Sequence, residues 1–102
     1  MRKSILSSLI AMMALAVSAV EVTSWDGLNN AIAERHKEIT VTASFSSPKS
    51  NATIEIPEGC TVTLNDGKNI TLHYSAGYSV LGKVFGAYKA VIKGSGKIIT
   101  AQ

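Results

Sequence analysis

Few side chains in this sequence could act as nucleophiles, proton carriers or metal ligands. Cys60 is the only cysteine, and His36 and His73 are the only histidines. A catalytic thiol needs a nearby histidine and an orienting carboxylate or amide, and a zinc site needs histidines or cysteines at short spacing. Neither histidine has such a partner along the chain. We therefore expect no catalytic residue, no metal site and no cofactor, and we expect Cys60 to be a small buried side chain facing inward from a strand.

The acidic and phosphate-binding motifs of common enzymes are also missing. Glu55 and Glu58 flank Pro57 at an expected turn, so they do not define the separated pair of carboxylates that a glycosidase uses. The segment 94–97, Gly-Ser-Gly-Lys, lacks the spacing and the following helix of a phosphate loop. These observations favour a binding or structural role over an enzymatic one.

Exposed strand faces offer the best candidate binding surface. Threonines fall on the outward phase of several expected strands, where a hydroxyl-rich face could contact carbohydrate or another protein. Aromatic rings later in the chain could stack on sugar rings. The candidate surface-binding residues are Thr40, Thr42, Thr61, Thr63, Thr71, Tyr78 and Tyr88. Asn51 and Asn69 begin N-glycosylation acceptor motifs, which matter only in a eukaryotic host.

The segment 1–19 has the pattern of a signal peptide. Arg2 and Lys3 precede a mostly apolar stretch over residues 5–17, and Val17-Ser18-Ala19 supplies small residues for cleavage after Ala19, with a cut after Ala16 as the second choice. Thirteen helical residues span only about 20 Å, less than the roughly 30 Å of a hydrocarbon core. We expect a secreted or cell-surface protein whose mature chain, residues 20–102, forms one domain without a transmembrane segment.

Charge and size narrow the function classes further. The chain has 102 residues and a formal charge of +3, of which Arg2 and Lys3 would leave with the signal peptide. The remaining lysines are spread along the sequence, so we expect no nucleic-acid binding. A mature domain of this size without a disulfide has a core of marginal size.

The elements that must position these residues are one helix and a series of short strands. Ser24 is a suitable N-cap for a helix over residues 25–35, with Trp25 in its buried stripe. Alternation of apolar and hydroxyl residues predicts a strand over 39–45, and shorter strands follow over 54–56, 60–64 and 69–74. We expect these shorter strands to face inward through Ile54, Ile56, Val62, Leu64, Ile70 and Leu72.

The spacing favours a repeating coil. Ile54, Val62 and Ile70 lie at an even interval of eight, and glycine turns divide the short strands. The phrase 52–64, Ala-Thr-Ile-Glu-Ile-Pro-Glu-Gly-Cys-Thr-Val-Thr-Leu, and the later segment 94–99 resemble the opening coils of right-handed parallel β-helix proteins of the pectate-lyase-like fold, a family that includes many exported bacterial surface proteins. The resemblance covers nearly all of the chain after the predicted signal peptide. It implies a mostly β fold with an N-terminal capping helix and incomplete coils.

This resemblance implies two functions. The first is a non-catalytic adhesion, binding or structural role, with pairing to a further strand at the C-terminal edge, because two to three coils leave that edge unpaired. The alternative is the N-terminal part of a polysaccharide lyase or another carbohydrate-active enzyme. A lyase would show clustered aspartates, whereas Asp26 and Asp66 are the only aspartates.

A competing fold also fits the pattern. Asp66-Gly67 lies between two alternating segments, as in a two-residue β-hairpin turn. Antiparallel pairing there would give a small antiparallel α+β fold or a β-sandwich.

Overall fold

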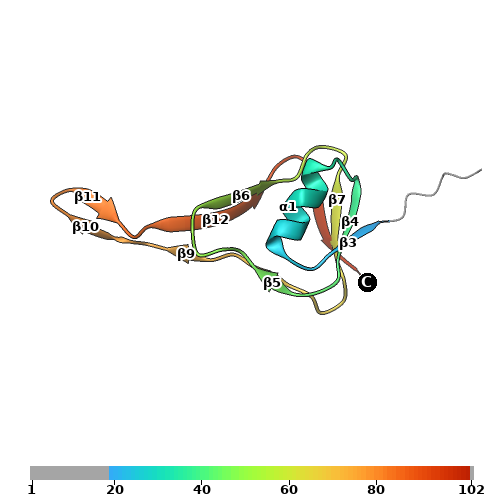
Figure 1. Ribbon diagram of the computed structural model, residues 1–102, viewed down its shortest axis with the longest axis horizontal. Helices are drawn as coiled ribbons and strands as arrows, with labels where there is room; N and C mark the ends of the chain where they lie inside the picture. The colour runs from blue at the N-terminus through green and yellow to red at the C-terminus, as the bar shows by residue number, and fades with distance from the viewer. Residues whose placement is uncertain (1–18, 102) are drawn as a thin grey trace, which may run out of the picture.

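The computed structural model describes residues 19–101, which form a mostly β structure with one short helix (Figure 1). The expected signal peptide, apart from Ala19, lies outside these residues. Within the described range, helical structure does not reach the length and hydropathy that crossing a bilayer requires. The elements are β3 (Val20–Val22), α1 (Trp25–Ala33), β4 (Glu38–Val41), β5 (Phe45–Ser46), β6 (Ala52–Glu55), β7 (Thr61–Leu64), β8 (Ile70–Thr71), β9 (Tyr74–Ser75), β10 (Tyr78–Val80), β11 (Lys83–Phe85), β12 (Tyr88–Lys93) and β13 (Lys97–Thr100).

The strands form four small sheets of mixed direction. The largest has the order β13-β7-β4-β3, and all of its pairs are parallel. Strands β5 and β8 form a second parallel pair, and β6 pairs in parallel with β12. The β9–β12 and β10–β11 pairs are antiparallel. These small mixed sheets match the α+β alternative better than a regular β-helix.

The hairpin that this alternative placed at Asp66-Gly67 is wrong. Strand β7 pairs with β4 and β13, whereas β8 pairs with β5, so the strands on either side of the turn lie in different sheets. The Lys68 N–H donates to the Asn65 carbonyl at 3.0 Å, and Gly67 has a φ of +75°. The turn therefore directs the chain from one sheet into the next instead of reversing it.

The predicted helix is present and ends two residues earlier than expected. The Ser24 hydroxyl accepts a hydrogen bond from the Gly27 N–H at 2.9 Å, which caps the first turn. At the other end, the Arg35 N–H donates to the Ile32 carbonyl and the His36 N–H to the Ala31 carbonyl. Arg35 has a left-handed φ of +68°, and this bonding pattern closes the helix as a glycine commonly does.

The single strand predicted over residues 39–45 is wrong, because the chain bends between β4 and β5. The Thr42 N–H donates to the Val22 carbonyl at 3.0 Å, which completes the first ladder. Three residues later the Phe45 N–H donates to the Asn69 carbonyl at 3.0 Å and begins a different ladder. Alternation continues through this corner, so the sequence pattern did not reveal it.

The strand predicted over residues 69–74 is likewise divided, into β8 and β9. The His73 N–H donates to the Ser47 hydroxyl at 2.8 Å instead of continuing the β5–β8 ladder. Leu72, expected to face inward, is 40% exposed. The chain leaves the packed body at this point, so the side chain of Leu72 has no core to pack against.

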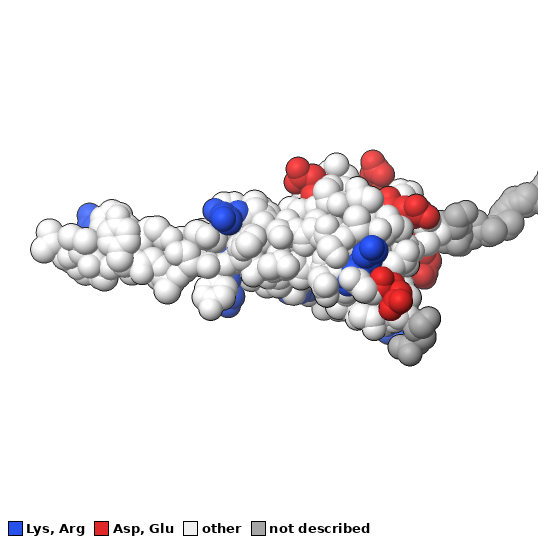
Figure 2. Space-filling view, turned by 90° about the horizontal axis from the view of Figure 1, so that it is seen from below, with Lys and Arg blue, Asp and Glu red and all other residues white. Residues whose placement is uncertain are grey.

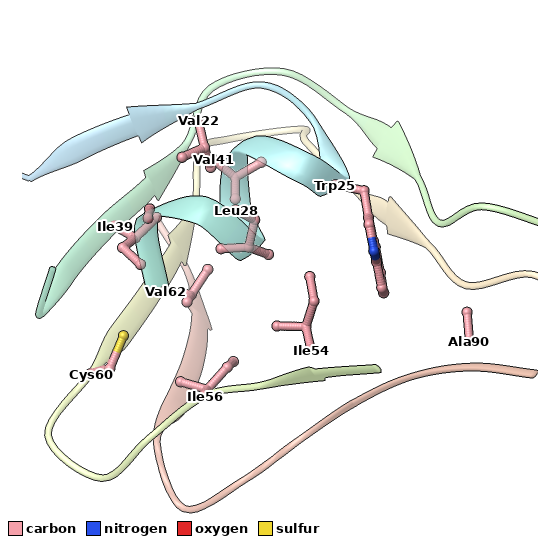
Figure 3. Packing of buried hydrophobic residues seen from close by; sticks show 11 residues of the cluster. Val22, Trp25, Leu28, Ile39, Val41, Ile54, Ile56, Cys60, Val62 and Ala90 are labelled. Carbon is pink, nitrogen blue, oxygen red and sulfur yellow. The ribbon is translucent and has the colours of Figure 1, made fainter. Parts of the chain in front are cut away.

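The core gathers side chains from the helix and the parallel strands (Figure 3). Leu28 projects from α1 toward Val62 and Val41, while Trp25 extends from the first turn of α1 toward Ile54. The buried residues are Val22, Trp25, Leu28, Ala31, Ile39, Val41, Ile54, Ile56, Cys60, Val62 and Ala90. The predicted core position of Trp25 and the inward positions of Ile54, Ile56 and Val62 are confirmed, whereas Leu64 and Ile70 are half-buried against this cluster.

A long projection extends from this packed body. We call residues 74–88 the arm; they comprise β9, β10, β11 and the first residue of β12. Figure 1 shows the arm pointing away from α1 and the four-stranded sheet. None of its residues is fully buried, so it adds surface to the molecule and almost no core.

Candidate functional site

A pocket of about 590 Å³ lies at the base of the arm. Its lining combines aromatic, hydroxyl, amide and ammonium groups without a carboxylate. The lining residues are Asn51, Tyr74, Ser75, Ala87, Tyr88 and Lys89.

Backbone pairing between β9 and β12 brings this set together. Ser75 lies opposite Tyr88, and Tyr74 lies opposite Lys89 in the antiparallel ladder. The Lys89 N–H donates to Oδ1 of Asn51 at 2.9 Å, which fixes the loop before β6 against the arm. Because Oδ1 accepts this bond, the Asn51 amide group is oriented and keeps two N–H donors for a ligand.

The pocket can bind a molecule with both flat apolar faces and polar edges. The phenol rings of Tyr74 and Tyr88 supply stacking surface, and Tyr74 is 75% exposed. Asn51 and Lys89 supply hydrogen-bond donors, and the Ser75 hydroxyl accepts a long hydrogen bond from the Gly77 N–H at 3.4 Å. The ammonium group of Lys89 favours a neutral or anionic ligand over a cationic one.

Of the seven residues predicted as a binding surface, the structure brings together the three on β4 and β7, which are Thr40, Thr61 and Thr63. Thr40 and Thr63 are ladder partners. Thr61 lies two residues before Thr63 on β7, and its ladder partners are Glu38 and Lys97. The hydroxyl face is therefore bordered by charged side chains.

The remaining candidates lie elsewhere. The Thr42 hydroxyl donates to the Val22 carbonyl at 3.5 Å at the corner after β4, and exposed Thr71 lies on β8. Tyr78 stacks on Phe85 within the arm, with ring centroids 5.7 Å apart. Of the seven predicted residues, Tyr88 is the one that lines the pocket.

Asn51 and Lys89 are pocket residues that sequence reasoning missed. Asn51 stood out only as a glycosylation motif, and Lys89 as one of several dispersed lysines. Their contact joins two segments that are far apart along the chain. The two tyrosines at the ends of the arm, Tyr74 and Tyr88, were the one feature of the sequence that could have indicated this pocket.

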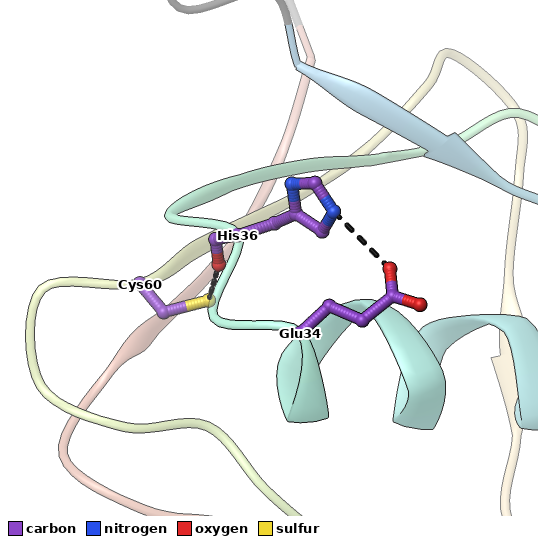
Figure 4. Close-up of polar contacts among 3 residues, drawn as sticks. All are labelled: Glu34, His36 and Cys60. Carbon is purple, nitrogen blue, oxygen red and sulfur yellow. Dashed lines mark hydrogen bonds and ion pairs between the residues drawn. The ribbon is translucent and has the colours of Figure 1, made fainter.

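Cys60 is buried, as predicted, but it directly precedes β7 instead of lying within a strand, and its side chain sits near the end of α1 (Figure 4). Its thiol donates to the His36 carbonyl at 3.5 Å, while the His36 ring lies 3.3 Å from a carboxylate oxygen of Glu34 on the surface. Burial raises the pKa of the Cys60 thiol, and the negative charge of Glu38 raises it further. The imidazole contacts Glu34 and not the sulfur, so these groups do not form a nucleophile and base pair.

The ionisable side chains of residues 19–101 do not gather into a metal-binding group of three or more. Asp26 lies in the first turn of α1, and Asp66 lies in the turn after β7. The described structure therefore does not bring the two aspartates into one cluster of the kind a calcium-dependent lyase would need.

Comparison with known proteins found no match to this chain among protein-family models, curated proteins or solved structures.

Proposed function

We propose that this chain is an exported, non-catalytic binding protein that holds a saccharide in the pocket at the base of the arm. The observation that carries the proposal is the pairing of two tyrosine rings with the donors of Asn51 and Lys89 in one cavity. Sugar rings present an apolar C–H face and polar hydroxyl edges, and this lining offers a partner for each.

The charge of the pocket favours an acidic saccharide. Lys89 is the charged residue of the lining, and its ammonium can meet a carboxylate or sulfate group on the sugar. Export through the predicted signal peptide would place the protein where such polysaccharides occur, at the cell surface or outside the cell.

We also propose that the body is an incomplete parallel β-solenoid interrupted by the arm. The antiparallel pairs are confined to β9–β12 and β10–β11, which are the arm and its base. Outside them, β4 and β7, β5 and β8, and β6 and β12 pair in parallel, in the same order along the chain. Each pair supports stacking of one turn of chain on the previous one, as the β-helix resemblance implies.

In this arrangement β13 would begin a further turn. It lies at the end of the four-stranded sheet, where Ile98 and Ile99 are 46% and 47% exposed. An exposed edge with apolar side chains can pair with another strand. Adhesion or assembly through this edge is the structural part of the proposed role.

Isothermal titration tests the saccharide proposal, with oligogalacturonate as the acidic probe and a cello-oligosaccharide as the neutral one. We expect tighter binding of the acidic probe, weakening as salt rises. Tyr74→Ala should weaken binding about tenfold, which matches the loss of one aromatic contact of about 1.4 kcal/mol. Lys89→Gln should remove most of the preference for the acidic probe.

Two variants outside the pocket serve as controls. Tyr78→Ala removes another exposed tyrosine, and Lys93→Gln removes another exposed lysine of β12. Both should leave saccharide affinity within about twofold of the original protein. Failure of the acidic probe to bind, or equal losses in the control variants, would contradict the proposal. Cleavage of the acidic probe would instead favour the polysaccharide-lyase alternative.

A further inference from the structure

The tip of the arm places a large apolar side chain in an unfavourable backbone conformation. Strands β10 and β11 are joined by the two-residue turn Leu81-Gly82, in which φ is +52° and +78°. Such turns strongly prefer asparagine, aspartate or glycine at the first position, because the left-handed conformation is costly for other side chains. Leu81 is nevertheless 98% exposed, so no contact within the described structure compensates for the strain.

Further apolar surface surrounds this residue. Val80 and Val84 are 48% and 64% exposed, and the stacked rings of Tyr78 and Phe85 are 63% and 43% exposed. These four residues and Leu81 form what we call the apolar tip. Val84 pairs with Ser79 on one face of the hairpin, whereas Val80, Tyr78 and Phe85 lie on the other, so both faces expose apolar side chains. Such exposure, at the end of a projection without a core, is typical of an interaction surface.

The charges near the tip are all positive. The seven Asp and Glu residues of the chain all lie between positions 21 and 66, whereas residues 67–102 contain five lysines and no acidic residue. Lys83 lies directly beside the turn, opposite Val80. On the face shown in Figure 2, acidic side chains gather over the body, while those along the arm that carry charge are basic.

We propose that the apolar tip inserts into the interfacial region of an anionic lipid membrane. Apolar and aromatic side chains beside Lys83, with no acidic residue in the arm, match the headgroup boundary in both polarity and charge. Each three-residue strand of the hairpin spans roughly 10 Å, which is comparable to the depth of the headgroup and upper acyl region. All seven acidic residues lie outside the arm, and they would remain in water away from the anionic surface when the arm points toward the lipid.

Charge decides between a membrane and a second copy of this chain as the occupant. The arm hairpin carries one charged side chain, Lys83. The rest of residues 19–101 has seven basic and seven acidic side chains, so a second copy of the body offers Lys83 no net negative charge. A lipid surface supplies both an extended negative charge and an apolar interior. The membrane proposal is independent of the saccharide pocket, which lies at the opposite end of the arm.

Vesicle co-sedimentation tests the proposal directly. The exported, processed protein is mixed with phosphatidylcholine vesicles, with and without phosphatidylglycerol, at low and high salt. We expect binding to the anionic vesicles that weakens with salt, and little binding to phosphatidylcholine alone. Leu81→Asn should lower the partition coefficient about tenfold, because it removes one buried leucine from the lipid. It should also keep the hairpin, since Asn-Gly is a favoured sequence for this turn.

A matched control removes an equally apolar side chain elsewhere. Ile99→Asn alters the exposed β13 edge and should leave vesicle binding unchanged within twofold. Leu81→Trp provides an independent readout, because Trp25 is buried in the body and its emission should stay constant while the new indole shifts to the blue on anionic vesicles. No binding to anionic vesicles, equal loss in Ile99→Asn, or self-association that Leu81→Asn abolishes in the absence of lipid would each overturn the proposal.

Discussion

Replacement of Gly94 by alanine should destabilise the body because the chain crosses another segment closely at this point. The Ile56 N–H donates to the Lys93 carbonyl at 2.8 Å, and the Gly96 N–H donates to the Ile56 carbonyl at 2.9 Å. Gly94 lies between these two bonds with a φ of +118°. An added Cβ would contact the Ile56 carbonyl oxygen and would lie 2.8 Å from its backbone nitrogen.

Two separate costs contribute to the loss. A non-glycine residue at positive φ costs about 1–2 kcal/mol, and displacement of a packed backbone costs about 1–3 kcal/mol more. The total loss in the free energy of unfolding is therefore about 2–5 kcal/mol, a large share of the stability of a domain of this size. Gly59 isolates the first cost, because it has a φ of +88° but no atom within 4 Å of an added Cβ.

Urea denaturation followed by circular dichroism measures both variants. We expect Gly59→Ala to lower the free energy of unfolding by about 1–2 kcal/mol and Gly94→Ala to lower it by about 1–3 kcal/mol more. The expected fall in melting temperature for Gly94→Ala is roughly 10–25 °C. Equal losses in the two variants would refute the close crossing of residues 93–96 over Ile56.

Three further predictions concern the helix and the core. Arg35→Gly should raise the free energy of unfolding by about 0.5–1 kcal/mol, because glycine adopts the left-handed φ at the end of α1 without strain; a lower urea midpoint would contradict this. Leu28→Ala should cost about 2–5 kcal/mol because Leu28 is fully buried, whereas Leu72→Ala, at an exposed position, should cost under about 1 kcal/mol in the same assay. Because the pKa of the Cys60 thiol is raised in the folded state, its contribution to stability is full at neutral pH and is lost as pH rises above the ordinary thiol range. Urea midpoints measured across alkaline pH should therefore fall more steeply for the original protein than for Cys60→Ala, and parallel curves would count against burial of the thiol.

Local sequence patterns predicted the start of the helix and the inward faces of the central strands correctly. Ser24 capped the helix as expected, and the alternation around Ile54 and Val62 identified the inward faces. Alternation failed at the corners, because it continues through Thr42 while the hydrogen-bond partner changes from one ladder to another. Alternation also predicted burial of Leu72 wrongly, because the chain has left the packed body at this position.

The even spacing of Ile54, Val62 and Ile70 marks successive strands along the chain, but these strands are not ladder partners. These residues lie on β6, β7 and β8, which belong to three different sheets. Ladder partners lie further apart along the chain, since Ile39 pairs with Val62 and Ile54 pairs with Ile92. The second of these separations is the longer one because it includes the arm, whose length no local pattern predicted.

The candidate pocket was the least predictable feature. The aromatic residues were noticed because of their type, but the partner loop was not, since the contact of Asn51 with Lys89 depends on where β12 returns beside β6. Sequence patterns that carry no pairing information cannot place two such segments next to each other.

The way the arm joins the body makes it replaceable. Tyr74 and Lys89 face each other as ladder partners, so the chain leaves and re-enters at points about 5 Å apart. A short turn could bridge that gap while β12 kept its register on β6. The scaffold could thus exchange this hairpin for another graft, which would allow related or engineered chains to diversify what they recognise without rebuilding the parallel ladders.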